Sequence, residues 1–164
     1  MGETTVDPDI AAEAATLLHR EAALLDAADL EAWLTLYTQD CFYWMPLVED
    51  QADPFDHPSI IFENRHLMEI RRRNLTVGTA PSKDYTIRGV RMIGDIAVAP
   101  CAEAPGEFIA TSKFVAVIRW RRKEYHAGHC EHRLRATPDG LRIVSKRVNL
   151  IDSDLPMETM ITYL

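Results

Sequence analysis

Hydrophobic residues recur at helical spacing through the first part of the chain. Over residues 8–27 the apolar positions repeat about every 3.6 residues, and this pattern predicts an amphipathic helix. One polar residue, Glu21, interrupts the apolar stripe of that helix. Asp29 is suited to cap a second, short helix, because its carboxylate can accept a hydrogen bond from the first turn. The apolar face of the second helix carries Leu30, Trp33, Leu34 and Tyr37.

The next segment changes from a strand pattern to a loop pattern and then to a helical one. Residues 41–45 are rich in aromatic side chains and predict a strand that Pro46 ends. Residues 46–58 are rich in Pro and Asp, which predicts a surface loop. Ser59 is suited to cap a third helix that runs to about Leu75. The expected inner positions of this helix are Ile60, Phe62 or Glu63, Leu67 and Ile70.

After Leu75 the apolar period changes to about 2, which indicates β-strands. The expected strands span residues 85–93 (continuing over 95–99), 107–120, 125–136 and 141–152. The sequence Thr-Pro-Asp-Gly at 137–140 is a turn signal between the last two strands. Helices followed by a meander of strands predict an α+β fold, with three N-terminal helices packed on one face of a curved antiparallel sheet. We expect residues 1–164 to form a single domain, with residues 1–7 as a flexible tail.

Charge is unevenly distributed along the chain. The 164 residues carry a formal net charge of −7, yet residues 1–60 hold thirteen acidic residues and one basic residue, Arg20. Residues 61–164 hold twelve acidic and seventeen basic residues. A net acidic chain binds phosphate backbones poorly, because such affinity comes mainly from Lys and Arg. We therefore expect no nucleic-acid partner and interpret the basic run at 119–123 as a solvated or interface strand.

Neither a membrane anchor nor a secretion signal is evident in the sequence. No apolar stretch approaches the roughly 20 residues that a membrane helix needs. The first residues lack the basic and apolar regions of a signal peptide. The three cysteines, Cys41, Cys101 and Cys130, are widely spaced and odd in number, which fits reduced thiols better than a disulfide framework. We expect a cytoplasmic protein that does not associate with membranes.

Two local patterns are similar to metal-binding motifs, but neither is complete. His126 and His132 share a face of an expected strand about 20 Å apart, and His129 points the other way, whereas zinc ligands must lie about 2 Å from one ion. Cys130 and His132 supply one half of a Rieske site, which needs two Cys and two His. No cysteine follows Cys130, so the second half is missing. The sequence therefore predicts no complete metal site in this chain.

A self-contained enzyme is the alternative that the sequence leaves open. A curved sheet capped by helices can enclose an apolar cone, in which an Asp or His beside a Tyr would carry out the proton transfer of an isomerase, dehydratase or hydrolase. A Gly-x-Ser-x-Gly nucleophile motif and a Gly-rich phosphate loop are both absent. The pocket residues for this alternative would be Tyr37, Asp40, Tyr43, His66 and Tyr85.

Several short motifs follow one another in a specific order from Ala14 to Leu164. Their order and spacing resemble the β (small) subunits of aromatic-ring-hydroxylating dioxygenases, particularly benzoate-type members. Four departures, Lys83, Ile70, His129 and Glu131, affect substrate subtype and interface contacts rather than the family. The motifs that carry the resemblance are Glu21-Ala22-x-Leu24-Leu25-Asp26, Trp33-Leu34-x-Leu36-Tyr37, Tyr43-Trp44-Met45-Pro46, Pro81-Ser82-Lys83, Tyr125-x-x-Gly128, Arg133-Leu134-Arg135 and Ile143-x-x-Lys146-Arg147-Val148-x-Leu150.

The resemblance implies a cystatin-like cone, similar to ketosteroid isomerase, and a structural rather than catalytic role. It implies that the chain trimerises and assembles with three α subunits into an α3β3 hexamer that dihydroxylates an aromatic ring. The α subunit would hold the Rieske [2Fe-2S] cluster and the mononuclear iron, and a reductase or ferredoxin would supply electrons indirectly. The resemblance implies no metal or cofactor in this chain.

Arginines of the third helix and of the long strands are candidates for subunit contacts. In a trimer the long strands are natural packing surfaces, and Arg suits desolvated ion pairs because its planar guanidinium is pre-organised. We predict that several of these arginines pair with carboxylates within or between subunits. They are Arg71, Arg73, Arg119, Arg121, Arg133 and Arg147.

Overall fold

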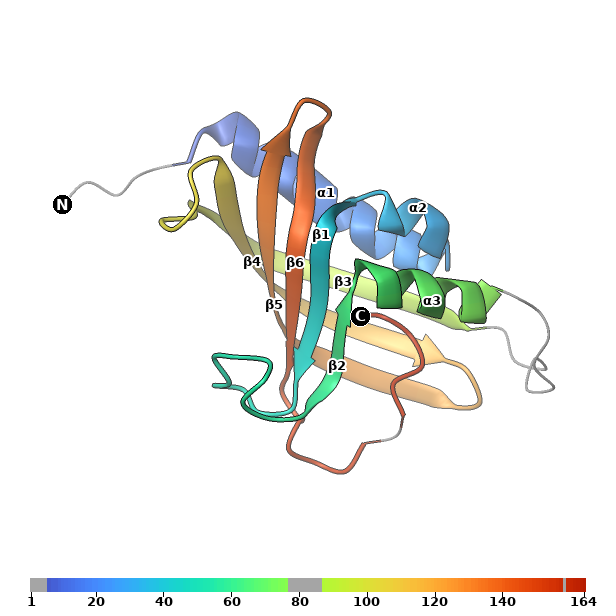
Figure 1. The fold of residues 1–164 in the computed structure, drawn as a ribbon. Helices are drawn as coiled ribbons and strands as arrows, with labels where there is room; N and C mark the ends of the chain where they lie inside the picture. Colours follow the sequence, from blue (N-terminus) through green and yellow to red (C-terminus); the bar gives the residue numbers. More distant parts are fainter. Residues whose placement is uncertain (1–5, 77–86, 158) are drawn as a thin grey trace.

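A computed structural model describes residues 6–76, 87–157 and 159–164, in which helices pack against one strongly curved sheet (Figure 1). The predicted α+β cone is confirmed. The elements in chain order are α1 (Pro8–Asp26), α2 (Leu30–Leu34), β1 (Tyr37–Pro46), β2 (Ser59–Asn64), α3 (Arg65–Thr76), β3 (Arg88–Pro100), β4 (Glu107–Arg119), β5 (Lys123–Thr137) and β6 (Gly140–Leu150).

The sheet has six strands in the order β2-β1-β6-β5-β4-β3. Neighbouring strands pair antiparallel as predicted, except that β1 pairs parallel with β6. This pair joins strands that are distant in the sequence, with Trp44 opposite Arg147. The sheet is therefore mixed. The β1–β2 hairpin attaches through this parallel pair to the edge of a four-stranded antiparallel meander.

The prediction that the third helix begins at Ser59 is wrong. Residues 59–64 form β2, which pairs with β1 and places Trp44 opposite Phe62. The apolar run in this segment fits both a strand and a helix, and pairing with the free edge of β1 decides between them. The helix α3 begins at Arg65, where Asn64 Oδ1 accepts a hydrogen bond of 3.0 Å from Leu67 N. Leu67 is therefore exposed, and Met68 faces the core instead.

The first two helices form as predicted, with a difference at Tyr37. Glu21 and the apolar residues of α1 are buried against the sheet, and Asp29 caps α2 by accepting a hydrogen bond of 3.0 Å from Ala32 N. Tyr37 does not lie on a helix, because α2 ends at Leu34 and Tyr37 begins β1. The first strand is thus longer than the predicted 41–45 segment, and it runs from the helix layer to Pro46.

The long strands have two different faces. Even-numbered residues of β4, such as Ser112 and Phe114, are buried beneath the helices, and the odd-numbered Val115 is exposed on the opposite side. We call these the inner and the outer sheet face. Among the described residues, no helix is long and apolar enough to cross a membrane. Cys41, Cys101 and Cys130 are free thiols.

Candidate functional site

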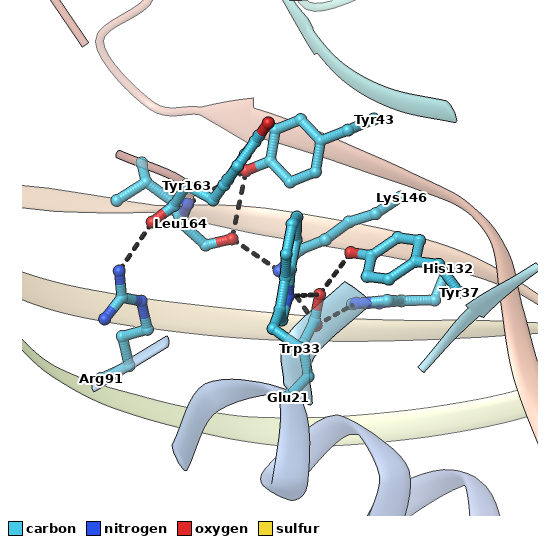
Figure 2. A network of polar contacts seen from close by, with 9 residues as sticks. All are labelled: Glu21, Trp33, Tyr37, Tyr43, Arg91, His132, Lys146, Tyr163 and Leu164. Carbon is cyan, nitrogen blue, oxygen red and sulfur yellow. Dashed lines mark hydrogen bonds and ion pairs between the residues drawn. The ribbon is translucent and has the colours of Figure 1, made fainter. Parts of the chain in front are cut away.

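The carboxylate of Glu21 lies at the centre of the cone and is surrounded by hydrogen-bond donors (Figure 2). Glu21 projects from α1 onto the inner sheet face and is 2% exposed. Its Oε1 accepts from Trp33 Nε1 at 3.2 Å and from Tyr37 OH at 2.5 Å. Its Oε2 lies 2.8 Å from His132 Nε2 and 3.0 Å from Lys146 Nζ. An ionised carboxylate offers about four lone-pair positions, so all of its acceptor capacity is used.

The charges of this cluster follow from its burial and its ion pair. Burial opposes ionisation of Glu21, but the Lys146 ammonium and His132 outweigh it and hold the pKa of the carboxyl well below its usual range. Burial lowers the pKa of His132 despite the neighbouring Glu21, so this imidazole is neutral and donates through Nε2. Burial and the Glu21 carboxylate raise the pKa of Tyr37 far above its usual value. The cluster is therefore one buried Glu21–Lys146 ion pair with three neutral donors.

The last residues of the chain lie inside the cone and extend this network (Figure 2). The Leu164 backbone oxygen accepts from Lys146 Nζ at 2.6 Å and from Tyr43 OH at 3.1 Å. Arg91 donates to the Tyr163 carbonyl at 2.6 Å and forms an ion pair with Asp26 at 2.6 Å. The Tyr163 ring stacks on Trp33 with centroids 4.5 Å apart. Tyr163 and Leu164 therefore fill part of the cone interior.

Little free volume is left beside the Glu21 cluster. A cavity of about 20 Å³ is bounded by polar residues, among them Glu21, His132 and Lys146, and by apolar side chains. That volume suits about one water molecule, whereas pockets for small organic ligands measure roughly 300–1,000 Å³. His132 borders this cavity, and its Nδ1 atom makes no hydrogen bond in the structure. Beside the Glu21 cluster, the described residues thus leave room for about one water molecule and too little for an aromatic ring.

The candidate pocket residues are only partly brought together. Tyr37 and Tyr43 both belong to the network, as donors to Glu21 and to Leu164. Asp40 is exposed at the surface, where its ion pair with Arg135 lowers the pKa of the carboxyl to about 2. His66 is exposed on α3. The fifth candidate, Tyr85, lies outside the described residues.

Three residues are central to the network, but the sequence patterns predict none of them as a pocket residue. They are Glu21, His132 and Lys146. The interruption of the apolar stripe at Glu21 was a usable signal, because a carboxylate on a buried helix face requires a buried partner. His132 and Lys146 carry a weaker signal, since each is a polar residue at an inward position of an alternating strand. Their distances from Glu21 depend on how α1 crosses β5 and β6, and local patterns do not contain that information.

The strand histidines lie as the alternation predicts. His126 and His132 are on the inner face, and His129 is exposed on the outer face. Among the residues that the structure describes, no three His, Cys, Asp or Glu side chains are grouped closely enough to hold a metal ion.

The six arginines proposed for subunit contacts have different surroundings. Arg71 pairs with Glu63, and Arg133 pairs with Glu107, within the chain. Arg147 lies 4.4 Å from the Trp44 ring centroid, and Arg121 lies 4.5 Å from that of Trp120. Arg73 Nε donates to the Glu69 carbonyl at 3.5 Å, and Arg119 is exposed on the outer face. Their role between subunits stays a prediction.

Comparison with known proteins places this cone in a family. The family model described as "Ring hydroxylating beta subunit" matches residues 20–157. The small oxygenase component of the p-cumate 2,3-dioxygenase system of Pseudomonas putida is 29% identical over 138 residues, which cover 82% of this chain and 76% of the relative. The matched region contains every element from the end of α1 to the end of β6.

Solved structures of such subunits have the same fold. The β subunit of benzoate 1,2-dioxygenase from Burkholderia mallei has a TM-score of 0.70 at 23% identity, covering 94% of this chain and 97% of that chain. A chain of naphthalene 1,2-dioxygenase has a TM-score of 0.80 at 18% identity, covering 98% of this chain and 89% of that chain. Since the family model spans most of its length, the chain belongs to the family of ring-hydroxylating β subunits, the small subunits of ring-hydroxylating dioxygenases.

Proposed function

We propose that this chain is a structural subunit that assembles with iron-bearing α subunits into an α3β3 dioxygenase and takes no direct part in the chemistry. The single observation that carries its non-catalytic role is the Glu21 carboxylate, whose acceptor positions are all occupied by donors of the same chain. A general base needs a free lone pair within hydrogen-bond reach of its substrate. The carboxylate therefore stabilises the fold instead of moving a substrate proton.

The alternative of a self-contained acid–base enzyme is not favoured by the arrangement of its candidate residues. Asp40 and His66 are at the surface, whereas Tyr37 and Tyr43 are buried within the filled cone. Burial raises the pKa of Tyr43 well above its usual value, which suits a permanent donor to Leu164 rather than a proton shuttle. Among the four candidates that the structure describes, these positions leave no shared site where one substrate could contact an acid and a base.

We assign the cofactors and the substrate to the partner. In this proposal the α subunit holds the Rieske cluster and the mononuclear iron, and a reductase or ferredoxin delivers electrons to it. The family model and the dioxygenase name of the Pseudomonas putida relative support this division. That relative is named for p-cumate and a structural neighbour for benzoate, both aromatic carboxylates. We therefore propose an aromatic acid as the substrate class, and the cytoplasm as the location.

Co-expression with an α subunit tests the proposed assembly. The chain, produced together with the α subunit of the same dioxygenase, is expected to co-purify in equal amounts, with a mass that corresponds to three copies of each. The complex, supplied with dioxygen, an aromatic acid and a reductase with its reductant, is expected to form the cis-dihydrodiol. A chain that stays monomeric and never joins the α subunit would contradict the proposal.

A variant of the buried network separates a structural from a catalytic role. Tyr43→Phe removes the hydroxyl that contacts Leu164 but leaves the ring in place. We expect the turnover rate per assembled complex to stay within about twofold of the wild type, because this hydroxyl touches no substrate. A much lower rate in a complex of unchanged mass would instead favour catalysis inside the cone.

A further inference from the structure

The outer sheet face carries two adjacent apolar rows that no part of the described chain covers. Backbone pairing places Val90, Val117 and Tyr125 side by side across β3, β4 and β5, and Met92, Val115 and Ala127 in the next outward row. Val90 is 58% exposed, Met92 75%, Val115 53% and Tyr125 67%. Contiguous exposed apolar residues on a folded domain commonly mark an interaction site. This face therefore has the composition of a contact surface.

A row of positive charges borders the apolar rows at the end where β4 turns into β5. Arg88, Arg119 and Lys123 lie directly opposite one another on the three strands, and all three are exposed. None of the ion pairs within the described residues involves them. Like charges directly opposite each other destabilise a sheet. Carboxylates from outside the chain would therefore stabilise this row by pairing with its positive charges.

The loop between β1 and β2, residues 47–58, has the complementary composition. It exposes four carboxylates, Glu49, Asp50, Asp53 and Asp56, none of which forms an ion pair within the described residues. Between them projects Phe55, which is 82% exposed. The loop therefore combines negative charge with one prominent aromatic side chain. These two features complement the positive row and the apolar rows of the outer face.

The loop is already held in a defined conformation. The buried Gln51 donates from Nε2 to the Asp53 carbonyl at 2.9 Å and to the His57 carbonyl at 3.1 Å. Asp53 Oδ1 accepts from Phe55 N at 2.8 Å, and the Phe55 ring meets Phe62 edge-on with centroids 5.4 Å apart. A pre-organised loop loses little conformational entropy on binding. It is suited to insert into a partner surface as a rigid unit.

The loop and the outer face belong to different parts of one molecule. Figure 1 shows the loop at the end of β1 and β2, on the opposite side of the molecule from the β4–β5 hairpin. Two complementary patches at different places on one surface produce a head-to-tail contact between copies, which closes into a ring when the rotation allows. A head-to-tail contact of this kind, repeated between three copies, would form a trimer.

We propose that the outer sheet face of one copy binds the 47–58 loop of a second copy, with Phe55 on the apolar rows and the loop carboxylates at the Arg88–Arg119–Lys123 row. The proposal rests on the proposed function in one respect, namely that the chain trimerises. It adds the two surfaces that meet and the chemistry that joins them.

Charge reversal on each surface, and on both together, tests this contact in the full chain. One variant carries Arg119→Glu with Lys123→Glu, a second carries Asp50→Lys with Asp56→Lys, and a third combines all four changes. Each of the first two is expected to weaken self-association at least about tenfold in sedimentation, because like charges then face each other. The combined variant is expected to return to within about threefold of the wild type, because opposite charges again meet.

Matched controls separate the contact from general effects. Asp139→Lys reverses an exposed charge at the β5–β6 turn and is expected to leave self-association unchanged. Thermal unfolding of each variant checks that it is folded. Unaltered association of the face and loop variants, failure of the combined variant to recover, or a wild-type chain that is monomeric at high micromolar concentration would each overturn the proposal.

Pull-down with the α subunit distinguishes the two proposals. A face variant that still self-associates but no longer binds the α subunit would show that this surface serves the α subunit, and it would overturn the inference alone. A wild-type chain that trimerises through these surfaces yet never joins an α subunit would support the inference and contradict the proposed function.

Discussion

The two faces of the curved sheet use similar residue types in opposite ways. On the inner face, Glu21, His132 and Lys146 are buried and are joined by hydrogen bonds within one chain. On the outer face, Arg119 and Lys123 are exposed beside apolar residues. A buried charge without a partner is too costly to persist, whereas an exposed one is solvated at little cost. Polar and charged groups must therefore find partners within the chain inside the cone, whereas those on the outer face need none.

The largest expected effect is the loss of the buried carboxylate. Glu21→Ala leaves the Lys146 ammonium buried without a counter-ion and three donors without an acceptor. We expect the free energy of unfolding, measured with urea, to fall by about 3–5 kcal/mol. The matched control is Glu131→Ala, an exposed glutamate on the outer face of β5, for which we expect a change within about 0.5 kcal/mol.

A paired substitution sharpens this result. Glu21→Leu with Lys146→Met removes both charges and keeps apolar volume, so it is expected to be considerably more stable than Glu21→Ala. If Glu21→Ala changed the stability by no more than Glu131→Ala does, the claim that the inner face depends on its ion pair would be wrong.

A smaller effect is expected from adding one methyl group to a glycine on each face. A Cβ at Gly128 would lie 2.0 Å from the Asn149 backbone oxygen, so Gly128→Ala forces the backbones of β5 and β6 apart. We expect a loss of about 1–3 kcal/mol or more. A Cβ at Gly94 would meet nothing within 4 Å. Equal losses for Gly128→Ala and Gly94→Ala would contradict the tight strand approach described for Gly128.

The inner face also predicts how stability depends on pH. The pKa of His132 is lower in the folded chain than its ordinary value of 6.5, so below that pH the unfolded chain binds the proton more readily. Stability is therefore expected to fall, on the order of 1 kcal/mol, between pH 7.5 and 5.5. The His132→Gln variant should lose most of this dependence, and a wild-type chain that gains stability over this range would refute the assignment.

A further loss of stability is expected at more acidic pH. The pKa of Glu21 is depressed by Lys146 and His132 in spite of burial, so its contribution is present above its ordinary value of 4.5 and decreases as pH falls below it. Acid unfolding of the wild type and of the Glu21→Leu with Lys146→Met variant checks this, because the paired variant lacks the titrating group.

The smallest effect is expected for an ion pair in solvent. Asp40 and Arg135 form a bidentate pair with both distances at 3.0 Å, but both side chains are well exposed. Asp40→Asn is expected to change the free energy of unfolding by less than about 1 kcal/mol and to leave dioxygenase turnover unchanged. Lost turnover in an intact complex would instead support the alternative in which Asp40 is an acid–base residue.

The limits of sequence-based prediction are visible in β2 and in the candidate site. Strands with strict alternation, such as β4 and β5, agree with their predicted bounds to within about two residues. The apolar spacing of segment 59–64 fits both a helix and a strand, and the available edge of β1 makes it a strand. Two of the five pocket candidates, Tyr37 and Tyr43, lie in the network, since aromatic residues at inward strand positions are buried in any such cone.

The amino-acid sequence by itself determined the α+β class, the order of most elements and, through ordered motifs, the family. These features depend on local periodicity and on spacing along the chain. Only the tertiary structure decided that Glu21 meets Lys146, 125 residues away, and that Arg88, Arg119 and Lys123 form one row. Strand register and helix crossing bring such residues together, because they are set by packing of the whole chain and not by neighbouring residues.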